Sequence, residues 1–91
     1  MNKLIRVTQV VPLKGFLCRV TFEDGIQKII DVEPFLHGPI FEEIHNNMEL
    51  FRSIRVIEGT IGWENGADID PDVIYYDLKP AWMEEMTARK V

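Results

Sequence analysis

The chain has 91 residues, a length that suits one domain with one modest hydrophobic core. Hydrophobic residues make up 46% of the chain and charged residues 27%, which is a globular composition and excludes an intrinsically disordered chain. The net charge of −5 disfavours non-specific binding to nucleic acid, and no apolar run is long enough for a signal peptide or a membrane span.

Cysteine content and the polar start of the chain indicate where the protein resides. The single cysteine, Cys18, has no second cysteine with which to form an internal disulfide. We therefore expect a single domain over residues 1–91, in the cytoplasm and without membrane attachment.

The first expected feature is a β-hairpin. Residues 4–11 alternate as a strand that ends at Pro12, and residues 16–22 form a second strand with one apolar face. A three-residue loop with Gly25 in the left-handed region joins this strand to residues 26–32. That loop is favoured over a two-residue loop because it pairs apolar with apolar residues: Phe22 with Ile26, Cys18 with Ile30, and Phe16 with Val32. Lys28 is the exception on this face, and we expect its ammonium at the sheet edge.

Short helical segments follow the hairpin. Gly38-Pro39 predicts a helix start with proline at the first helical position. The apolar stripe that should pack on the sheet consists of Ile40, Phe41, Ile44 and Met48. Asn47 is placed to cap a second short turn that carries Leu50 and Phe51.

The last third of the chain predicts a second set of strands and a closing helix. Residues 54–57 and 60–63 are strand-like, with a reversal at Gly59, and Asn65-Gly66 predicts a sharp turn. Residues 73–76 are rich in β-formers and predict a further short strand. Pro80 can open a C-terminal helix, whose apolar side comprises Trp82, Met83 and Met86.

The predicted fold class is therefore α+β. It comprises a small twisted antiparallel sheet with a short helix packed on it, a second small strand set around Trp63 and Tyr75, and a C-terminal helix.

The order of several short motifs resembles a known family. The motifs, in chain order, are Phe22-Glu23-Asp24-Gly25, Asp31-Val32, Gly38-Pro39-Ile40-Phe41, Phe51, Trp63-Glu64-Asn65-Gly66-Ala67-Asp68-Ile69, and Pro71-Asp72 before Ile74-Tyr75. Over residues 4–76 the chain resembles the bacterial domain-of-unknown-function family 2442. The resemblance implies an α+β fold, a bacterial cytoplasmic setting and no established enzymatic activity, and it leaves residues 77–91 as a C-terminal helical extension. Some relatives resemble the amino-terminal half of helix-turn-helix regulators, and others are paired with a second small protein in toxin and antitoxin arrangements.

No residue pattern predicts a catalytic, metal or cofactor site. Asp68, Asp70 and Asp72 alternate like the start of a calcium loop, but Val73 replaces its glycine and Lys79 its final glutamate. Asp68 and Asp70 are expected to hydrogen-bond turn amides instead.

The remaining candidates for chemistry are one thiol and two histidines. Cys18 lies mid-strand, where a thiol is buried and unreactive. His37 and His45 lack a second ligand at metal-binding spacing, and we expect both at the surface.

The charges are unevenly distributed along the chain. Residues 1–22 contain four basic residues and no acid, whereas residues 58–85 contain eight acids and one lysine. The four basic residues, candidates for a nucleic-acid-binding strand face, are Lys3, Arg6, Lys14 and Arg19. That face lacks aromatic side chains for stacking, so nucleic-acid binding ranks third among the hypotheses.

The leading hypothesis is a non-enzymatic protein-interaction or regulatory module, antitoxin-like or an adaptor. Its partner is a basic protein or a second copy of the chain in a homo-oligomer, and the candidate contact residues are Trp82, Met83, Met86, Glu64, Asp68, Asp70 and Asp72. The alternative is a small-ligand-binding or catalytic domain with a cleft near Trp63, Asp68 and Tyr75.

Overall fold

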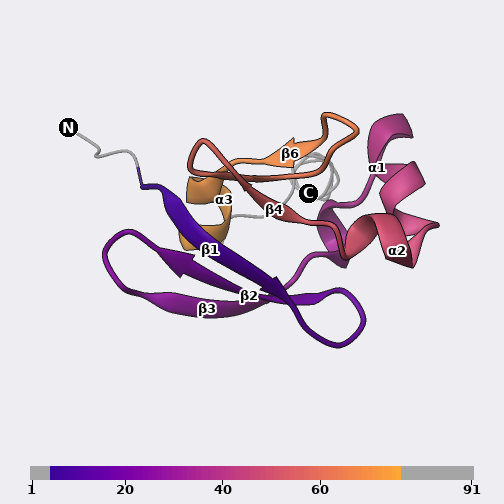
Figure 1. The fold of residues 1–91 in the computed structure, drawn as a ribbon. Helices are drawn as coiled ribbons and strands as arrows, with labels where there is room; N and C mark the ends of the chain where they lie inside the picture. Colours follow the sequence, from indigo (N-terminus) through magenta and orange to yellow (C-terminus); the bar gives the residue numbers. More distant parts are fainter. Residues whose placement is uncertain (1–4, 77–91) are drawn as a thin grey trace, which may run out of the picture.

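In the computed structural model, which describes residues 5–76, the chain forms two three-stranded antiparallel sheets connected by short helices (Figure 1). The first sheet, sheet A, has the order β1-β2-β3, and the second, sheet B, the order β4-β5-β6. The predicted α+β class is confirmed. The element bounds are β1 Val7–Pro12, β2 Leu17–Phe22, β3 Gln27–Asp31, a 3-10 helix Glu33–Phe35, α1 Pro39–His45, α2 Met48–Phe51, β4 Arg55–Ile57, β5 Thr60–Gly62, β6 Asp68–Ile69 and α3 Pro71–Tyr75.

The β2–β3 hairpin has the predicted register. Cys18 pairs with Ile30, and the Phe22 amide donates to the Ile26 carbonyl at 2.9 Å across the three-residue loop. Gly25 has a φ of 89°, which a residue with a Cβ adopts only at a cost. Alternation along β2 then turns Cys18, Val20 and Phe22 into the core.

Lys28 differs from its expected position at the sheet edge. Its ammonium donates to the Tyr75 carbonyl at 2.5 Å and to the Ile74 carbonyl at 3.5 Å, at the carboxyl end of α3. The carbonyls in the last turn of a helix lack partners within the helix, and a cation there also interacts favourably with the helix dipole. The one polar residue on the apolar face of β3 therefore fastens α3 to sheet A.

Helices α1 and α2 follow the predicted local signals. Pro39 occupies the first turn of α1, and the Asn47 side chain accepts a hydrogen bond from the Leu50 amide at 3.2 Å. The predicted apolar stripe of α1 is correct in part: Ile44 is buried, whereas Ile40 and Met48 are exposed. The helical turns are too short to carry all four stripe positions onto one covered face.

Sheet B is built on two tight turns. The Glu58-Gly59 turn joins β4 to β5, with Ile57 opposite Thr60, and both turn residues have positive φ. After β5, the Asn65-Gly66 turn is closed by a hydrogen bond from the Trp63 amide to the Ala67 carbonyl at 3.0 Å. The predicted reversals at Gly59 and Gly66 are thus confirmed.

The predicted strand over residues 73–76 is wrong, because this segment belongs to helix α3. Pro71 occupies the first turn of the helix, where its fixed φ suits the helix and its missing N–H costs nothing. Ile74 enters the core and the Tyr75 ring packs edge-on against Phe22 at 4.9 Å between centroids. Tertiary packing therefore overrides the β-propensity of Val73, Ile74 and Tyr75.

One hydrophobic core serves both sheets. Its largest fully buried side chains come from β2, from α1 and α2, and from sheet B or its flank: Val20, Phe22, Ile44, Phe51, Ile61 and Trp63. The sheets also meet through the backbone, since the Val7 amide donates to the Gly59 carbonyl at 2.8 Å. In Figure 1, α1 and α2 lie together at one end of the sheets and α3 lies toward the other.

Several predictions lie outside the described residues. They are the closing helix after Pro80, the extension over residues 77–91, the contact residues Trp82, Met83 and Met86, and the position of Lys3. No helix within residues 5–76 is long and apolar enough to cross a membrane.

Candidate functional site

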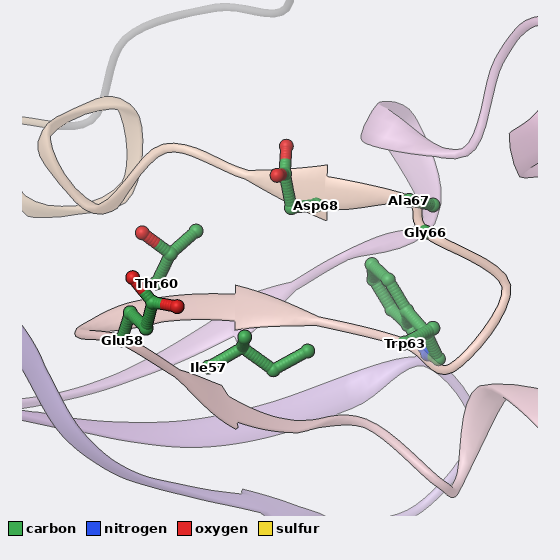
Figure 2. Close-up of a pocket in the computed structure, with 7 residues that line it drawn as sticks. All are labelled: Ile57, Glu58, Thr60, Trp63, Gly66, Ala67 and Asp68. Carbon is green, nitrogen blue, oxygen red and sulfur yellow. The ribbon is translucent and has the colours of Figure 1, made fainter.

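The outer face of sheet B carries a hollow of about 400 Å³ (Figure 2). It extends from the β4–β5 turn, where Glu58 and Thr60 lie together, toward the Asn65-Gly66 turn at the other end of β5. The lining residues are Ile57, Glu58, Thr60, Trp63, Gly66, Ala67 and Asp68.

The strand register explains why these side chains meet. Asp68 on β6 lies opposite Gly62 on β5, and Ile57 on β4 lies opposite Thr60. Gly62 has no side chain, and an added Cβ would stand 2.8 Å from the Ile57 Cδ1 atom. Because Gly62 leaves this space open, Ile57 lies across the strand and forms an apolar base for the hollow.

Trp63 contributes less surface to the hollow than the sequence suggested. Only 1% of the residue is exposed, and its indole N–H donates to the Phe51 carbonyl at 3.0 Å. Phe41 packs edge-on against the indole with 6.3 Å between centroids. A ring this enclosed holds α1 and α2 against sheet B and leaves no face on which a ligand could stack.

The polar groups of the hollow are predominantly acidic. Glu58 and Asp68 are exposed carboxylates, Thr60 supplies a hydroxyl, and none of the seven lining residues is a histidine, cysteine or lysine. Within residues 5–76 neither carboxylate forms a salt bridge. In this part of the chain no group of three or more metal-ligating side chains could hold a metal ion.

The other residues predicted on the acidic stretch are distributed around this region. Glu64, Asp70 and Asp72 are exposed, and only Asp68 lines the hollow. Asp70 precedes α3 without a side-chain capping bond, so its predicted role in bonding a turn amide is wrong. The Ala67 amide in this turn instead donates to the Asn65 side-chain oxygen at 3.1 Å.

Tyr75 lies away from Trp63 and Asp68, and the predicted three-residue cleft does not form. Tyr75 lines a separate hollow of about 440 Å³ together with Ile5, Glu23, Asp24 and Tyr76. Its hydroxyl donates to Asp24 at 2.5 Å. This hydrogen bond lowers the pKa of the Asp24 carboxyl and raises the pKa of the Tyr75 hydroxyl, because it favours the charged acid and the neutral phenol.

Cys18 and the histidines form no catalytic pair. The Cys18 thiol is wholly buried, and desolvation raises its pKa to about 11, so it stays protonated and unreactive as predicted. His45 stacks on Phe16 with 5.1 Å between ring centroids and lies 3.1 Å from a Glu33 carboxylate oxygen. The hydrogen bond that the Glu33 carboxylate accepts raises the pKa of His45.

The described basic residues of the first two strands do not form one face. The Arg6 guanidinium donates to the Glu58 carbonyl at 3.0 Å, beside sheet B. Lys14 lies in the β1–β2 turn, and Arg19 lies on the outer face of β2, opposite Val11 and Ile29. This separation removes the main support for the nucleic-acid hypothesis.

Five lining residues were not predicted as site residues from the sequence: Ile57, Glu58, Thr60, Gly66 and Ala67. The signal that could have found the first three is the dipeptide Glu58-Gly59. Taken as a two-residue hairpin loop, it pairs Ile57 with Thr60 and brings Glu58 beside them. Ala67 joins the hollow through the adjoining Asn65-Gly66 turn.

Within residues 5–76 the fold and the hollow define a small α+β domain. The sequence profile of the family described as protein of unknown function (DUF2442) matches residues 7–80. The chain therefore belongs to this family, as the motif order indicated. No curated protein and no solved structure matches the chain.

Proposed function

We propose that the protein is a non-enzymatic interaction module of a bacterial cytoplasm, antitoxin-like or an adaptor, that binds a basic segment of a partner protein in the hollow on sheet B. The observation that carries this proposal is the chemistry of the hollow. The lining combines an apolar base at Ile57 with two exposed carboxylates, Glu58 and Asp68, that have no cationic partner within the described residues. A lysine or arginine side chain matches both the apolar base and the carboxylates, since its stem is apolar and its head is cationic.

The geometry supports a protein partner better than a small ligand. Ligand sites usually enclose their ligand and offer aromatic faces, whereas the Trp63 ring is enclosed by Phe41 and Phe51. A catalytic role would need a nucleophile or a positioned acid and base, and the lining residues offer two exposed carboxylates and a threonine.

The test compares charge-neutral variants of the hollow with a matched control. The double variant Glu58→Gln, Asp68→Asn removes both carboxylates and keeps the size of the side chains. The control Glu42→Gln, Glu49→Gln changes the net charge equally on α1 and α2, where both residues are exposed. Proteins captured from native bacterial lysate on each tagged form are identified, and the captured partner is then purified and titrated calorimetrically.

We expect the hollow variant to bind the purified partner about tenfold more weakly than wild type, and the control to bind it as wild type does. Added salt should weaken the wild-type complex, because exposed charges are screened. Equal affinity of both double variants would refute the hollow as the binding surface. Saturable binding of a small organic cation with no protein captured would favour the ligand-binding alternative.

A further inference from the structure

Sheet A has one open edge within the described residues. β3 pairs with β2 on one side and with no other described strand (Figure 1). The opposite edge, β1, adjoins sheet B, where the Val7 amide donates to Gly59. An open strand edge presents unpaired N–H and C=O groups, which form a template for another strand.

β3 lacks three devices that protect many such edges: a proline, a bulge and an outward-facing lysine. It contains no proline, and its pairing with β2 has no bulge. Its one lysine, Lys28, is turned inward to α3 rather than out to solvent. On the outer face, Ile29 is 63% exposed, the largest exposure among the large hydrophobic side chains within residues 5–76.

The backbone pattern fixes which residues of β3 face the open edge. The Phe22 amide bonds the Ile26 carbonyl and the Val32 amide bonds the Phe16 carbonyl, so the even-numbered residues direct their backbone groups to β2. Gln27, Ile29 and Asp31 therefore direct their backbone groups to the open edge. Their side chains lie together on the outer face of sheet A, which is opposite to the core.

This sequence is complementary to itself when two β3 strands run antiparallel. Centring the pair on Ile29 sets Ile29 opposite Ile29 of the second copy and Gln27 opposite Asp31. Centring it on Lys28 would oppose two lysines, and centring it on Ile30 would oppose Ile29 with a carboxylate. Only the first arrangement buries the exposed isoleucine against an apolar partner and pairs an amide with an acid.

The groups needed for the amide and acid pair are available. The Gln27 side-chain nitrogen uses one of its two hydrogens for the Thr21 hydroxyl at 3.2 Å. Asp31 uses Oδ1 to accept from the Glu33 amide at 3.1 Å, which leaves Oδ2. Each copy thus retains one donor and one acceptor for the other.

From this complementarity we propose that two copies of the chain associate through β3, related by a two-fold axis at Ile29, to form a continuous six-stranded sheet. This surface is on sheet A, so the inference is independent of the hollow on sheet B. Backbone hydrogen bonds provide affinity in the same way wherever a strand is added to an exposed sheet edge.

Cysteine cross-linking of the full chain tests the register directly. Opposed Ile29 residues of a hydrogen-bonded pair have Cα atoms about 5.5 Å apart, within the range of a disulfide. Two Gln27 residues would lie about 14 Å apart, beyond that range. We expect Ile29→Cys to form a covalent dimer under mild oxidation and Gln27→Cys to remain monomeric. A mixture of Gln27→Cys with Asp31→Cys should form the mixed dimer. The native thiol does not interfere, since Cys18 is wholly buried.

A second measurement does not depend on oxidation. Light scattering of wild-type protein over a concentration series up to about 1 mM should give twice the chain mass of 10.6 kDa at the upper end. Ile29→Lys should stay monomeric, and Met48→Lys, an equally polar change on exposed α2, should associate as wild type does.

A monomer throughout the series, or equal cross-linking of Ile29→Cys and Gln27→Cys, would overturn the proposal. The effect of added salt distinguishes this self-association from the proposed partner binding. Screening should strengthen contact between two chains of net charge −5, whereas it should weaken binding of a basic partner.

Discussion

Gly59 is the residue at which the two sheets constrain each other most closely. Its φ of 81° favours glycine, and an added Cβ would stand 2.8 Å from the Arg6 side chain. The adjacent Glu58 carbonyl accepts the Arg6 hydrogen bond, and the Gly59 carbonyl accepts from Val7. A side chain at this position therefore strains the turn and also displaces the contact between β1 and sheet B.

We predict that Gly59→Ala lowers the free energy of unfolding more than Gly15→Ala does. Gly15 also has a positive φ, 61°, but nothing stands within 4 Å of its added Cβ. Gly15→Ala should lower the free energy of unfolding by about 1 kcal/mol, because alanine is strained in the left-handed backbone conformation. Gly59→Ala should lower it by about 1 kcal/mol more, because the added Cβ also displaces the Arg6 side chain from its hydrogen bond. Urea denaturation followed by circular dichroism measures both. Equal losses would mean that Arg6 moves aside without cost.

His45 carries a prediction about pH. The Glu33 hydrogen bond raises the pKa of His45, so the bond stabilises the folded chain fully below the ordinary histidine pKa of about 6.5. That stabilisation is lost as the pH rises through the raised pKa. We expect Glu33→Gln to lower the His45 pKa in an NMR titration, and Glu49→Gln, on α2, to leave it unchanged. An unchanged value in Glu33→Gln would show that the Phe16 ring stack, not the carboxylate, sets the titration.

At the scale of elements, the attachment of α3 rests on a few named contacts. Lys28 binds the carbonyls at the end of the helix, the Tyr75 hydroxyl binds Asp24 in the β2–β3 loop, and Ile74 fills the core. A helix of five residues is too short to be stable alone in water. Its existence therefore depends on its docking to the hairpin.

We predict that Lys28→Met, which keeps the stem and removes the ammonium, lowers the free energy of unfolding by about 1–2 kcal/mol. Hydrogen exchange of the Tyr75 and Tyr76 amides should accelerate more than exchange in β1. Lys14→Met, at an exposed turn, is the matched control and should change neither quantity. If exchange accelerates uniformly over the chain, Lys28 acts on global stability and not on α3 in particular.

Local signals predicted the elements whose determinants lie close together in the chain. The β2–β3 register followed from a three-residue loop and alternating side chains, and the α2 cap followed from Asn47. The strand predicted over residues 73–76 was wrong because the contacts that make it a helix, with Phe22, Asp24 and Lys28, come from 46 to 53 residues away in the chain. Propensity in a short window contains no information on such contacts.

The residues of the candidate site were likewise predictable only where local sequence signals determine their position. Asp68 was predicted from the sequence and lines the hollow, while Glu58 and Thr60 were missed because the strand pairing of sheet B brings them to Asp68. Tyr75 was assigned to the wrong hollow because a helix, not a strand, directs its ring toward the hairpin. A site assembled from three strands of one sheet depends on register, and register is weakly marked in strands of two or three residues.

At the scale of the whole molecule, the two sheets share one hydrophobic core, and we expect them to unfold together. Neither sheet has a core of its own, because β2, α2 and β5 contribute to the same buried cluster. Three strands with one face uncovered expose too much apolar surface to be stable without the other sheet. Loss of either sheet should therefore unfold the other.

We predict a single unfolding transition at both sheets, and the chain supplies one local probe for each. Cys18 is wholly buried in sheet A, so its rate of alkylation at mildly alkaline pH reports that sheet. Trp63 flanks β5, and in a Trp82→Phe variant its fluorescence reports sheet B alone. The urea midpoints from alkylation and fluorescence should coincide, and Gly59→Ala should shift both equally because it acts where the sheets meet. Two separate midpoints, or a shift confined to Trp63, would show that sheet B unfolds while sheet A stays folded. The hollow on sheet B would then be absent from the molecules in which sheet B is unfolded. Partner binding would weaken in proportion to the fraction of such molecules.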